Sequence, residues 1–461
     1  MPISTTLKKL VPSKLKHSHT PTSNGDKRID KVNGDDSPED ATTPPAEEVE
    51  AIEEFDVPSP DGSPTREIAE SELGMEGVAT EAEKEEIAKL IADYGSSSNT
   101  SWLEFSRYKI WRADKDIKGS SFRPVQGYLR SDPYVFAWGN PLVSDPSALT
   151  ETCLEFWKWA KSQKLKLVWC CVDDQMEKIL GKGSKFNWSI VSCIVEDVME
   201  PHNVVELATQ AGGDSSAKDF KKNVRRAERE GVDIREVGWN DWSDDQKKEV
   251  EEGIIAWKQA KSGLQLASTS FQPWVDAEHR RYFVAEHNDK IVGILILAIV
   301  GGNQFQIKNA ASFPGAPRGT SEYLIYQSMQ ALEEEDEGAT VFDDEEDRAR
   351  SPVRNMNADP SRESSVMSED SSASSDRPRR VTVTFGITAA DDLTAVDNLK
   401  GWRVSWLSKT YSKVVGATGI TKRGDFRSKF GTEHVPMYVC YPSKQGFGID
   451  GVRKLMKCLR Q

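Results

Sequence analysis

The feature that most constrains the fold is a run of three apolar segments near the middle of the chain. Arg281–His287 and Lys290–Val300 are rich in β-branched or aromatic residues, and Asn288-Asp289 lies between them as a two-residue turn. Gln304–Ala310 follows with a similar composition. The pattern therefore predicts an antiparallel meander of three strands.

Helical patterns lie on both sides of this meander in the sequence. Lys218–Glu230 has apolar residues at helical spacing and ends at Gly231, which suits a left-handed C-cap. Lys247–Ala260 is a second predicted helix, and the Gly/Pro loop Phe313–Gly319 leads into a third, Thr320–Leu332. Later predicted elements are two strands and a helix, at Val381–Phe385, Met437–Tyr441 and Trp402–Val415.

The first part of the chain shows a rougher version of the same order. Strands are predicted at Tyr134–Trp138, Leu165–Val172 and Ile190–Val195, with the aromatic helix Thr150–Ser162 after the first of them. The fold class is therefore α+β, and we expect two tandem acetyltransferase-like (GNAT) folds. Their expected ranges are 83–210 and 211–445, followed by a C-terminal segment, 446–461.

Charge and aromatic content separate two acidic attachments from a basic core. Residues 1–95 have a net charge of −12 and residues 333–380 one of −8, out of −14 for the whole chain, which leaves +6 for the rest. All 13 Trp lie in that rest. Residues 1–82 have too little apolar surface to offset the entropy of ordering, so we predict a disordered tail. The insert 333–380 is likewise predicted to be disordered.

Composition also argues against several protein classes. The longest apolar run, Ile291–Val300, is about half of what a membrane-spanning helix needs, and no apolar segment near the start resembles a secretory signal. The six Cys form no CxxC pair, so reduced thiols are expected rather than a structural zinc site. We expect a cytoplasmic protein, able to lie peripherally at membranes, that uses no metal or other cofactor.

Two basic segments predict an RNA-binding surface. Six basic side chains in twelve residues give the helix Lys218–Arg229 a cationic ridge suited to a phosphate backbone, although a solvated helix face is the alternative. A second basic segment near the C-terminus is interleaved with two Phe. The candidate RNA-binding residues are Lys218, Lys221, Lys222, Arg225, Arg226, Arg229, Lys422, Arg423, Arg427 and Lys429.

The loop that leads into Thr320–Leu332 is the candidate reaction centre. Its small residues let a ligand approach the backbone, and the N–H groups at a helix start bind an anion or a carbonyl oxygen. Glu322, in the first turn, either complements the helix dipole or acts as a proton acceptor or ammonium anchor. His202, His279 and His434 are interpreted as packing residues, and no motif identifies a covalent nucleophile.

Several short motifs occur in a fixed order along the chain. They are the basic helix closing on Gly231, the hairpin Phe283–Val300, Gly319–Leu324, Phe385-Gly386, and Phe426–Phe430 before Val435–Val439, with Trp138–Pro141 and Ile194–Asp197 in the first unit. In this order they resemble the aminoacyl-transfer domain of bacterial phosphatidylglycerol lysyltransferases. Three motifs depart from the family pattern, because Glu322 replaces an Asp, Arg427 a Lys, and His434–Met437 a Trp-Glu-Pro-Arg sequence.

The resemblance implies two fused GNAT folds that move an amino acid from aminoacyl-tRNA to a lipid hydroxyl. Fungal relatives esterify the 3β-hydroxyl of ergosterol, and the chain resembles the freestanding kind that makes ergosteryl-glycine, because no synthetase domain is evident. Its implied partners are glycyl-tRNA and membrane ergosterol. Glu322 would be the base or ammonium anchor, and the Thr320 and Ser321 backbone would hold the oxyanion. The implied pocket residues are Arg318, Gly319, Tyr323, Phe385 and Gly386.

Two other functions remain open. An acyl-CoA-dependent N-acyltransferase could use the same fold, but it would need a pyrophosphate-binding loop that Pro314–Thr320 matches poorly. A non-catalytic RNA- or lipid-binding module is the second alternative, and such a module would tolerate loss of Glu322.

Overall fold

The structure is a computed structural model. It describes residues 81–104, 106–210, 215–260, 272–350, 380–399, 404, 407–409, 411 and 426–459. The predicted disordered tail up to residue 80, most of the predicted helix Trp402–Val415, and the candidate residues Lys422 and Arg423 lie outside the described residues.

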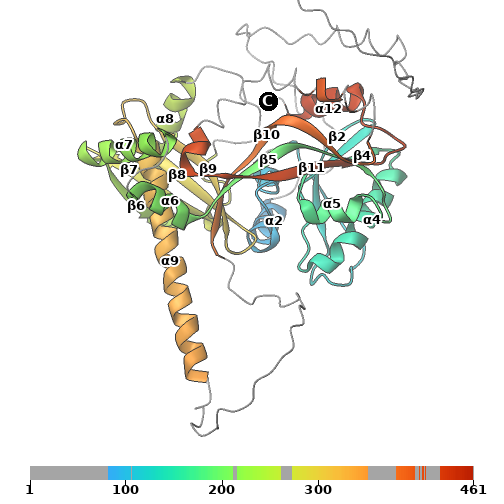
Figure 1. The fold of residues 1–461 in the computed structure, drawn as a ribbon, viewed down its shortest axis with the longest axis horizontal. Helices are drawn as coiled ribbons and strands as arrows, with labels where there is room; N and C mark the ends of the chain where they lie inside the picture. The colour runs from blue at the N-terminus through green and yellow to red at the C-terminus, as the bar shows by residue number, and fades with distance from the viewer. Residues whose placement is uncertain are drawn as a thin grey trace, which may run out of the picture.

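One eleven-stranded sheet forms the centre of the fold (Figure 1). Its strand order is β1-β2-β3-β4-β11-β5-β10-β9-β8-β7-β6. The strands are β1 (Lys109–Arg112), β2 (Val125–Ser131), β3 (Tyr134–Trp138), β4 (Lys166–Val172), β5 (Ser189–Met199), β6 (Asp233–Val237), β7 (Arg280–His287), β8 (Lys290–Val300), β9 (Gln304–Ser312), β10 (Thr382–Asp397) and β11 (Glu433–Tyr441).

Helices cover both faces of this sheet. Those of the first part are α2 (Glu81–Tyr94), α3 (Ser101–Glu104), α4 (Leu149–Ser162), α5 (Asp174–Leu180) and α6 (Pro201–Thr209). Those of the second part are α7 (Ser215–Arg229), α8 (Asp244–Ala260), α9 (Thr320–Arg350) and α12 (Ile449–Leu459). Short 3-10 turns are η2 (Pro146–Ala148), η3 (Trp239–Asp241), η4 (Ala277–His279) and η5 (Ser428–Phe430).

Each half of the sheet repeats one arrangement. In the second half, the antiparallel meander β6–β9 is followed by α9 and then by β10, which pairs with β9 in parallel. In the first half, β1–β3 form the meander, α4 follows, and β4 pairs with β3 in parallel. The α+β class and the acetyltransferase-like order predicted from the sequence are confirmed.

The two halves exchange strands at the centre. β5 comes from the first part of the chain but pairs with β10 and β11, whereas β11 comes from the end of the chain and pairs with β4 and β5. In Figure 1 these three strands run across the middle of the molecule. Because both halves share these strands, the division into ranges 83–210 and 211–445 stays a prediction.

Two elements are longer than the sequence predicts. α9 does not end at Leu332 but continues to Arg350, so residues 333–350 of the predicted disordered insert are helical. Six of these 18 residues are Glu, which favours a helix, and Ser351-Pro352 follows them, as expected because the residue before proline disfavours helix. β10 continues past Phe385 to Asp397, with a register shift between Thr384 and Ile387.

An aromatic cluster fixes the segment that follows the undescribed residues 412–425. Phe430 is fully buried, and its ring lies 5.1 Å from that of Phe220 on α7 and 5.5 Å from that of Phe385 on β10. Phe426 lies 5.3 Å from Phe430 but is only partly buried. Phe430 therefore holds the short segment around η5 against both a helix and the sheet.

Phe430→Ala should lower the free energy of unfolding by about 3–5 kcal/mol, because it leaves a cavity among closely packed rings. Phe426→Ala is the matched control and should cost clearly less, since its side chain is partly exposed. Urea denaturation followed by circular dichroism measures both. Equal losses in the two variants would contradict the anchoring role of Phe430.

Candidate functional site

The site is built where strands β9 and β10 separate. Their parallel pairing covers only Thr382–Thr384 against Gln304–Gln306. Gly386 follows with a positive φ of 77°, and a Cβ there would lie 2.7 Å from Gln306 Nε2. The next residues of both strands line a cavity of about 30 Å³. Its lining includes Gln306, Lys308, Phe385, Gly386, Ser97 and Thr100.

Glu322 is held in a polar cluster at the start of α9. Its side chain is 10% exposed, Asn223 Nδ2 on α7 donates to Oε1 at 2.8 Å, and Lys429 Nζ lies 3.2 Å from the same oxygen. Three separate segments, α7, α9 and η5, thus meet at one carboxylate. The Glu322 carboxylate therefore does more than complement the helix dipole, because it already contacts the ammonium group of Lys429.

The helix start is partly occupied by its own loop. Thr320 N donates to Pro317 O at 3.3 Å, and Thr320 Oγ1 donates to the same oxygen at 2.7 Å. The predicted oxyanion donor Thr320 is therefore already bonded. Ser321 Oγ lies 2.6 Å from Ser312 Oγ on β9, which fixes the first turn of α9 against the sheet.

Gly319 brings α9 close to α7. Its φ is +97°, and a Cβ at this position would lie 2.2 Å from the backbone oxygen of Asn223. A side chain would therefore push the two helices apart. Of the other predicted pocket residues, Arg318 is exposed, Tyr323 packs partly buried against the α7–α9 core, and Phe385 and Gly386 lie at the opening.

A second carboxylate, Asp197 on β5, lies on the other side of the η5 segment. It is fully buried, with Arg427 Nη1 at 2.6 Å from Oδ2 and His434 Nδ1 at 2.7 Å from Oδ1. Arg427 also lies 5.5 Å above the Phe385 ring, and its Nη1 is 3.5 Å from Gly386 O. The basic segment before β11 therefore connects both carboxylates to the opening. The interpretation of His434 as a packing residue does not fit, because its side chain is 58% exposed.

Helix α7 presents a basic row to solvent. The exposed row lines a surface hollow of about 790 Å³. Its members are Lys218, Lys222, Arg225 and Arg229. Two predicted members differ from it: Lys221 is buried and its Nζ donates to Gln210 O, and Arg226 pairs with Glu230 at 2.8 Å. Arg427 and Lys429, also predicted to bind RNA, are paired with Asp197 and Glu322.

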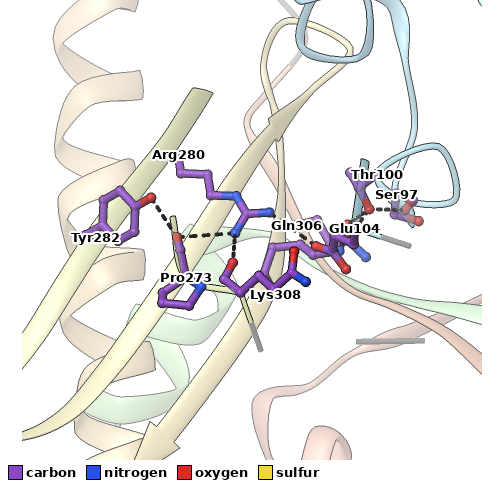
Figure 2. A network of polar contacts seen from close by, with 9 residues as sticks. Ser97, Thr100, Glu104, Pro273, Arg280, Tyr282, Gln306 and Lys308 are labelled. Carbon is purple, nitrogen blue, oxygen red and sulfur yellow. Dashed lines mark hydrogen bonds and ion pairs between the residues drawn. The ribbon is translucent and has the colours of Figure 1, made fainter. Parts of the chain in front are cut away.

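A buried charge network beside the cavity between β9 and β10 was missed from the sequence (Figure 2). Glu104 Oε1 lies 2.9 Å from Lys308 Nζ and 3.2 Å from Arg280 Nη2, and all three side chains are at most 3% exposed. Lys308 also donates to Thr100 Oγ1 at 2.9 Å. Burial lowers the pKa of Lys308. The only sequence signal was a lysine inside an apolar strand, and the network ties α3 to β7 and β9.

Among the described residues, membrane-spanning helices and clusters of metal ligands are both absent. In the part of the chain that the structure describes, no helix is long and apolar enough to span a bilayer. The same residues hold no group of three or more His, Cys, Asp or Glu placed to bind a metal ion.

Comparison with known proteins assigns the family. Residues 96–350, more than half of the chain, match the family described as phosphatidylglycerol lysyltransferase, C-terminal. The chain belongs to this family. Its members include aminoacyl-tRNA-dependent lipid aminoacyltransferases, so the general reaction is transfer of an aminoacyl group to a lipid. No curated protein matches the chain.

Solved structures show the same fold. The chain is similar to L-PGS from Bacillus licheniformis, with 11% identity and a TM-score of 0.56 over 83% of this chain and 97% of that one. It is also similar to the C-terminal domain (DUF2156) of a putative lysylphosphatidylglycerol synthetase from Agrobacterium fabrum, with 14% identity and a TM-score of 0.53 over 82% and 96%. At these sequence identities, the structural similarity establishes the fold of this chain.

Removing the basic row should weaken tRNA binding. In a variant that combines Lys222→Ala, Arg225→Ala and Arg229→Ala, the slope of log K against log salt should fall by about 1 for each side chain that contacts a phosphate. Filter binding of aminoacyl-tRNA over a salt series measures it.

The control is a variant with three exposed helix lysines replaced by Ala, each of them paired with an acid four residues away. These are Lys89, Lys178 and Lys248. If both variants lose affinity equally, the α7 row is not the tRNA surface.

Proposed function

We propose that this protein transfers glycine from glycyl-tRNA to the 3β-hydroxyl of ergosterol, giving a sterol amino-acid ester. The general reaction follows from the family, while the sterol and the amino acid rest on the motif resemblance. The acceptor lies in a membrane, so the protein would work at a membrane surface, as a protein of the cytoplasm that associates peripherally.

The observation that carries the proposal is that helix α7 has two functional faces. Lys222 and Arg225 are exposed on the basic row, while Asn223 between them donates to Glu322 at 2.8 Å. A tRNA bound along this row would have its backbone within one helix diameter of the reaction centre. The helix thus joins polyanion binding to the Glu322 cluster at the start of α9.

The chemistry required of the protein is limited. An aminoacyl-tRNA ester is already activated, so exchange for a sterol ester needs positioning, removal of the hydroxyl proton and stabilisation of the oxyanion. We assign Glu322 to the amino group of the substrate, because this carboxylate already holds the ammonium of Lys429 at 3.2 Å. The backbone N–H groups of Ser321 and Glu322 would face the ester oxygen, because those of Thr320 and Tyr323 already donate within the loop.

The test is direct transfer of label. Purified protein is incubated with radiolabelled glycyl-tRNA and ergosterol-containing liposomes, and lipid is extracted. Label should enter the lipid phase, disappear after RNase pretreatment of the donor, and be released by mild alkali. A parallel reaction with aspartyl-tRNA or lysyl-tRNA identifies the donor, and liposomes with phosphatidylglycerol in place of ergosterol identify the acceptor.

Glu322→Gln should reduce transfer by at least tenfold. The main cause should be weaker binding of the donor's amino group, because a neutral amide holds an ammonium poorly. Glu333→Gln, farther along the same helix, is the control and should retain activity. Unchanged transfer by Glu322→Gln would remove Glu322 from the mechanism and favour a non-catalytic role for this cluster.

An acyl-CoA-dependent N-acyltransferase is the second candidate, on the basis of the acetyltransferase-like strand order alone. If no label is transferred from any aminoacyl-tRNA by folded protein, acetyl-CoA with amine acceptors is the next donor to test.

A further inference from the structure

The transfer reaction proposed above assigns no role to the pair formed by Asp197 and His434. Asp197 is fully buried, and its two carboxylate oxygens have different partners: Arg427 Nη1 at 2.6 Å and His434 Nδ1 at 2.7 Å. A guanidinium stays charged under all ordinary conditions, so Asp197 is held as an acceptor of both bonds.

This contact selects one form of the imidazole. A carboxylate oxygen only accepts hydrogen bonds, so His434 Nδ1 carries the hydrogen and Nε2 keeps its lone pair when the ring is neutral. The His434 side chain is 58% exposed, whereas Asp197 has no exposure. The edge of the ring that holds Nε2 therefore faces away from the buried carboxylate and toward solvent.

Arg427 links the pair to strand β10. Arg427, which shares Asp197 with His434, has its guanidinium 5.5 Å above Phe385 and its Nη1 3.5 Å from Gly386 O. Phe385 and Gly386 line the cavity where the strands separate. Arg427 thus joins His434 and Asp197 to Phe385, while Lys429, two residues on, contacts Glu322, so one short segment holds the imidazole pair and the Glu322 carboxylate in one cluster.

We propose that His434 accepts the proton of the acceptor hydroxyl during aminoacyl transfer, and that Asp197 is the residue that positions it. This inference rests on the proposed transfer function. Glu322 is less suited to the task, because its Oε1 already accepts from Asn223 and contacts Lys429. The two residues therefore have separate roles. Glu322 binds the amino group of the donor, and His434 accepts the proton of the acceptor hydroxyl.

The step balances without a further reactant. The hydroxyl oxygen forms a C–O bond to the ester carbonyl carbon while its proton moves to His434 Nε2. The tetrahedral intermediate then breaks its bond to the ribose oxygen of the tRNA, and the imidazolium returns the proton to that oxygen. The products are the lipid ester and a tRNA with a free terminal ribose hydroxyl, and His434 is neutral again.

The surroundings of His434 contain both signs of charge. Asp197 and Arg427 are the groups in its immediate contact network, and Glu433 precedes it on β11. Glu196 on β5 pairs with Val435, and burial raises the pKa of its carboxyl. Other acids lie farther along β11: Asp174 and Glu177 of α5 near Tyr438, and Asp397 of β10 near Cys440.

The kinetic test compares two histidine variants of the full chain. His434→Gln should lower kcat for transfer by about 10²-fold or more, leave KM for aminoacyl-tRNA within twofold, and remove the fall in rate at acidic pH that protonation of an imidazole base produces. His202→Gln is the matched control: His202 is 57% exposed and has a carboxylate partner, Glu333, at 2.7 Å. It should retain full activity and the same pH profile.

Two results would overturn the proposal: transfer by His434→Gln within threefold of the wild type, or an unchanged pH profile. The exposure of His434 and the remaining Asp197–Arg427 ion pair keep this variant folded, and circular dichroism checks it.

A second measurement is independent of transfer. Nitrogen-15 NMR of the histidine rings, with His434 assigned through its variant, should show the tautomer with hydrogen on Nδ1 at neutral pH, and Asp197→Asn should reduce that preference. The opposite tautomer in the wild type would reject the oriented pair. Absence of transfer by the wild-type protein from every donor would instead reject the proposed function together with the proton transfer, even if the oriented pair is found.

Discussion

The pairing of β5 with β10 and β11 is the constraint on which the rest of the structure depends. It places Asp197 opposite His434 and brings Thr384 next to Val198. Every functional contact in the centre of the sheet follows from this register. A shift by one residue would turn Asp197 to the other face and leave Arg427 without its carboxylate.

The site also depends on the sheet opening at one place. Parallel pairing of β9 and β10 stops after three residue pairs, at the point where Gly386 interrupts the regular register. Helices α7 and α9 then approach closely, because Gly319 leaves room for the backbone of Asn223. Sheet, helix start and basic helix thus converge at Glu322, and two glycines make that convergence possible.

Local pattern predicted much of this fold. The meander, the helix Lys218–Glu230 and the acetyltransferase-like order follow from apolar periodicity and turn residues, which act over short stretches of chain. The exposed row on α7 was also visible in the spacing of its charges. Lys221 differs because Gln210 O, at the end of α6, accepts from its Nζ, and helical spacing alone does not reveal such a contact.

Long-range contacts were beyond the sequence. Asp197 and His434 are 237 positions apart, Glu322 and Lys429 are 107 apart, and nothing local in either pair indicates the other. The exchange of β5 and β11 was missed for the same reason, since the register of distant strands depends on the assembled sheet. The continuation of α9 to Arg350 differs from the prediction for another reason: acidic composition indicates disorder, but Glu also favours helix.

The exchanged strands determine when each half of the protein can fold during synthesis. β4 needs β11 as a neighbour, and β11 is synthesised more than 250 residues after β4. Until then the first half has a central strand with an unpaired edge, and such edges recruit other chains. The protein therefore completes its first half only when its second half is finished. Premature termination between residues 172 and 433 would leave an aggregation-prone fragment rather than a folded half.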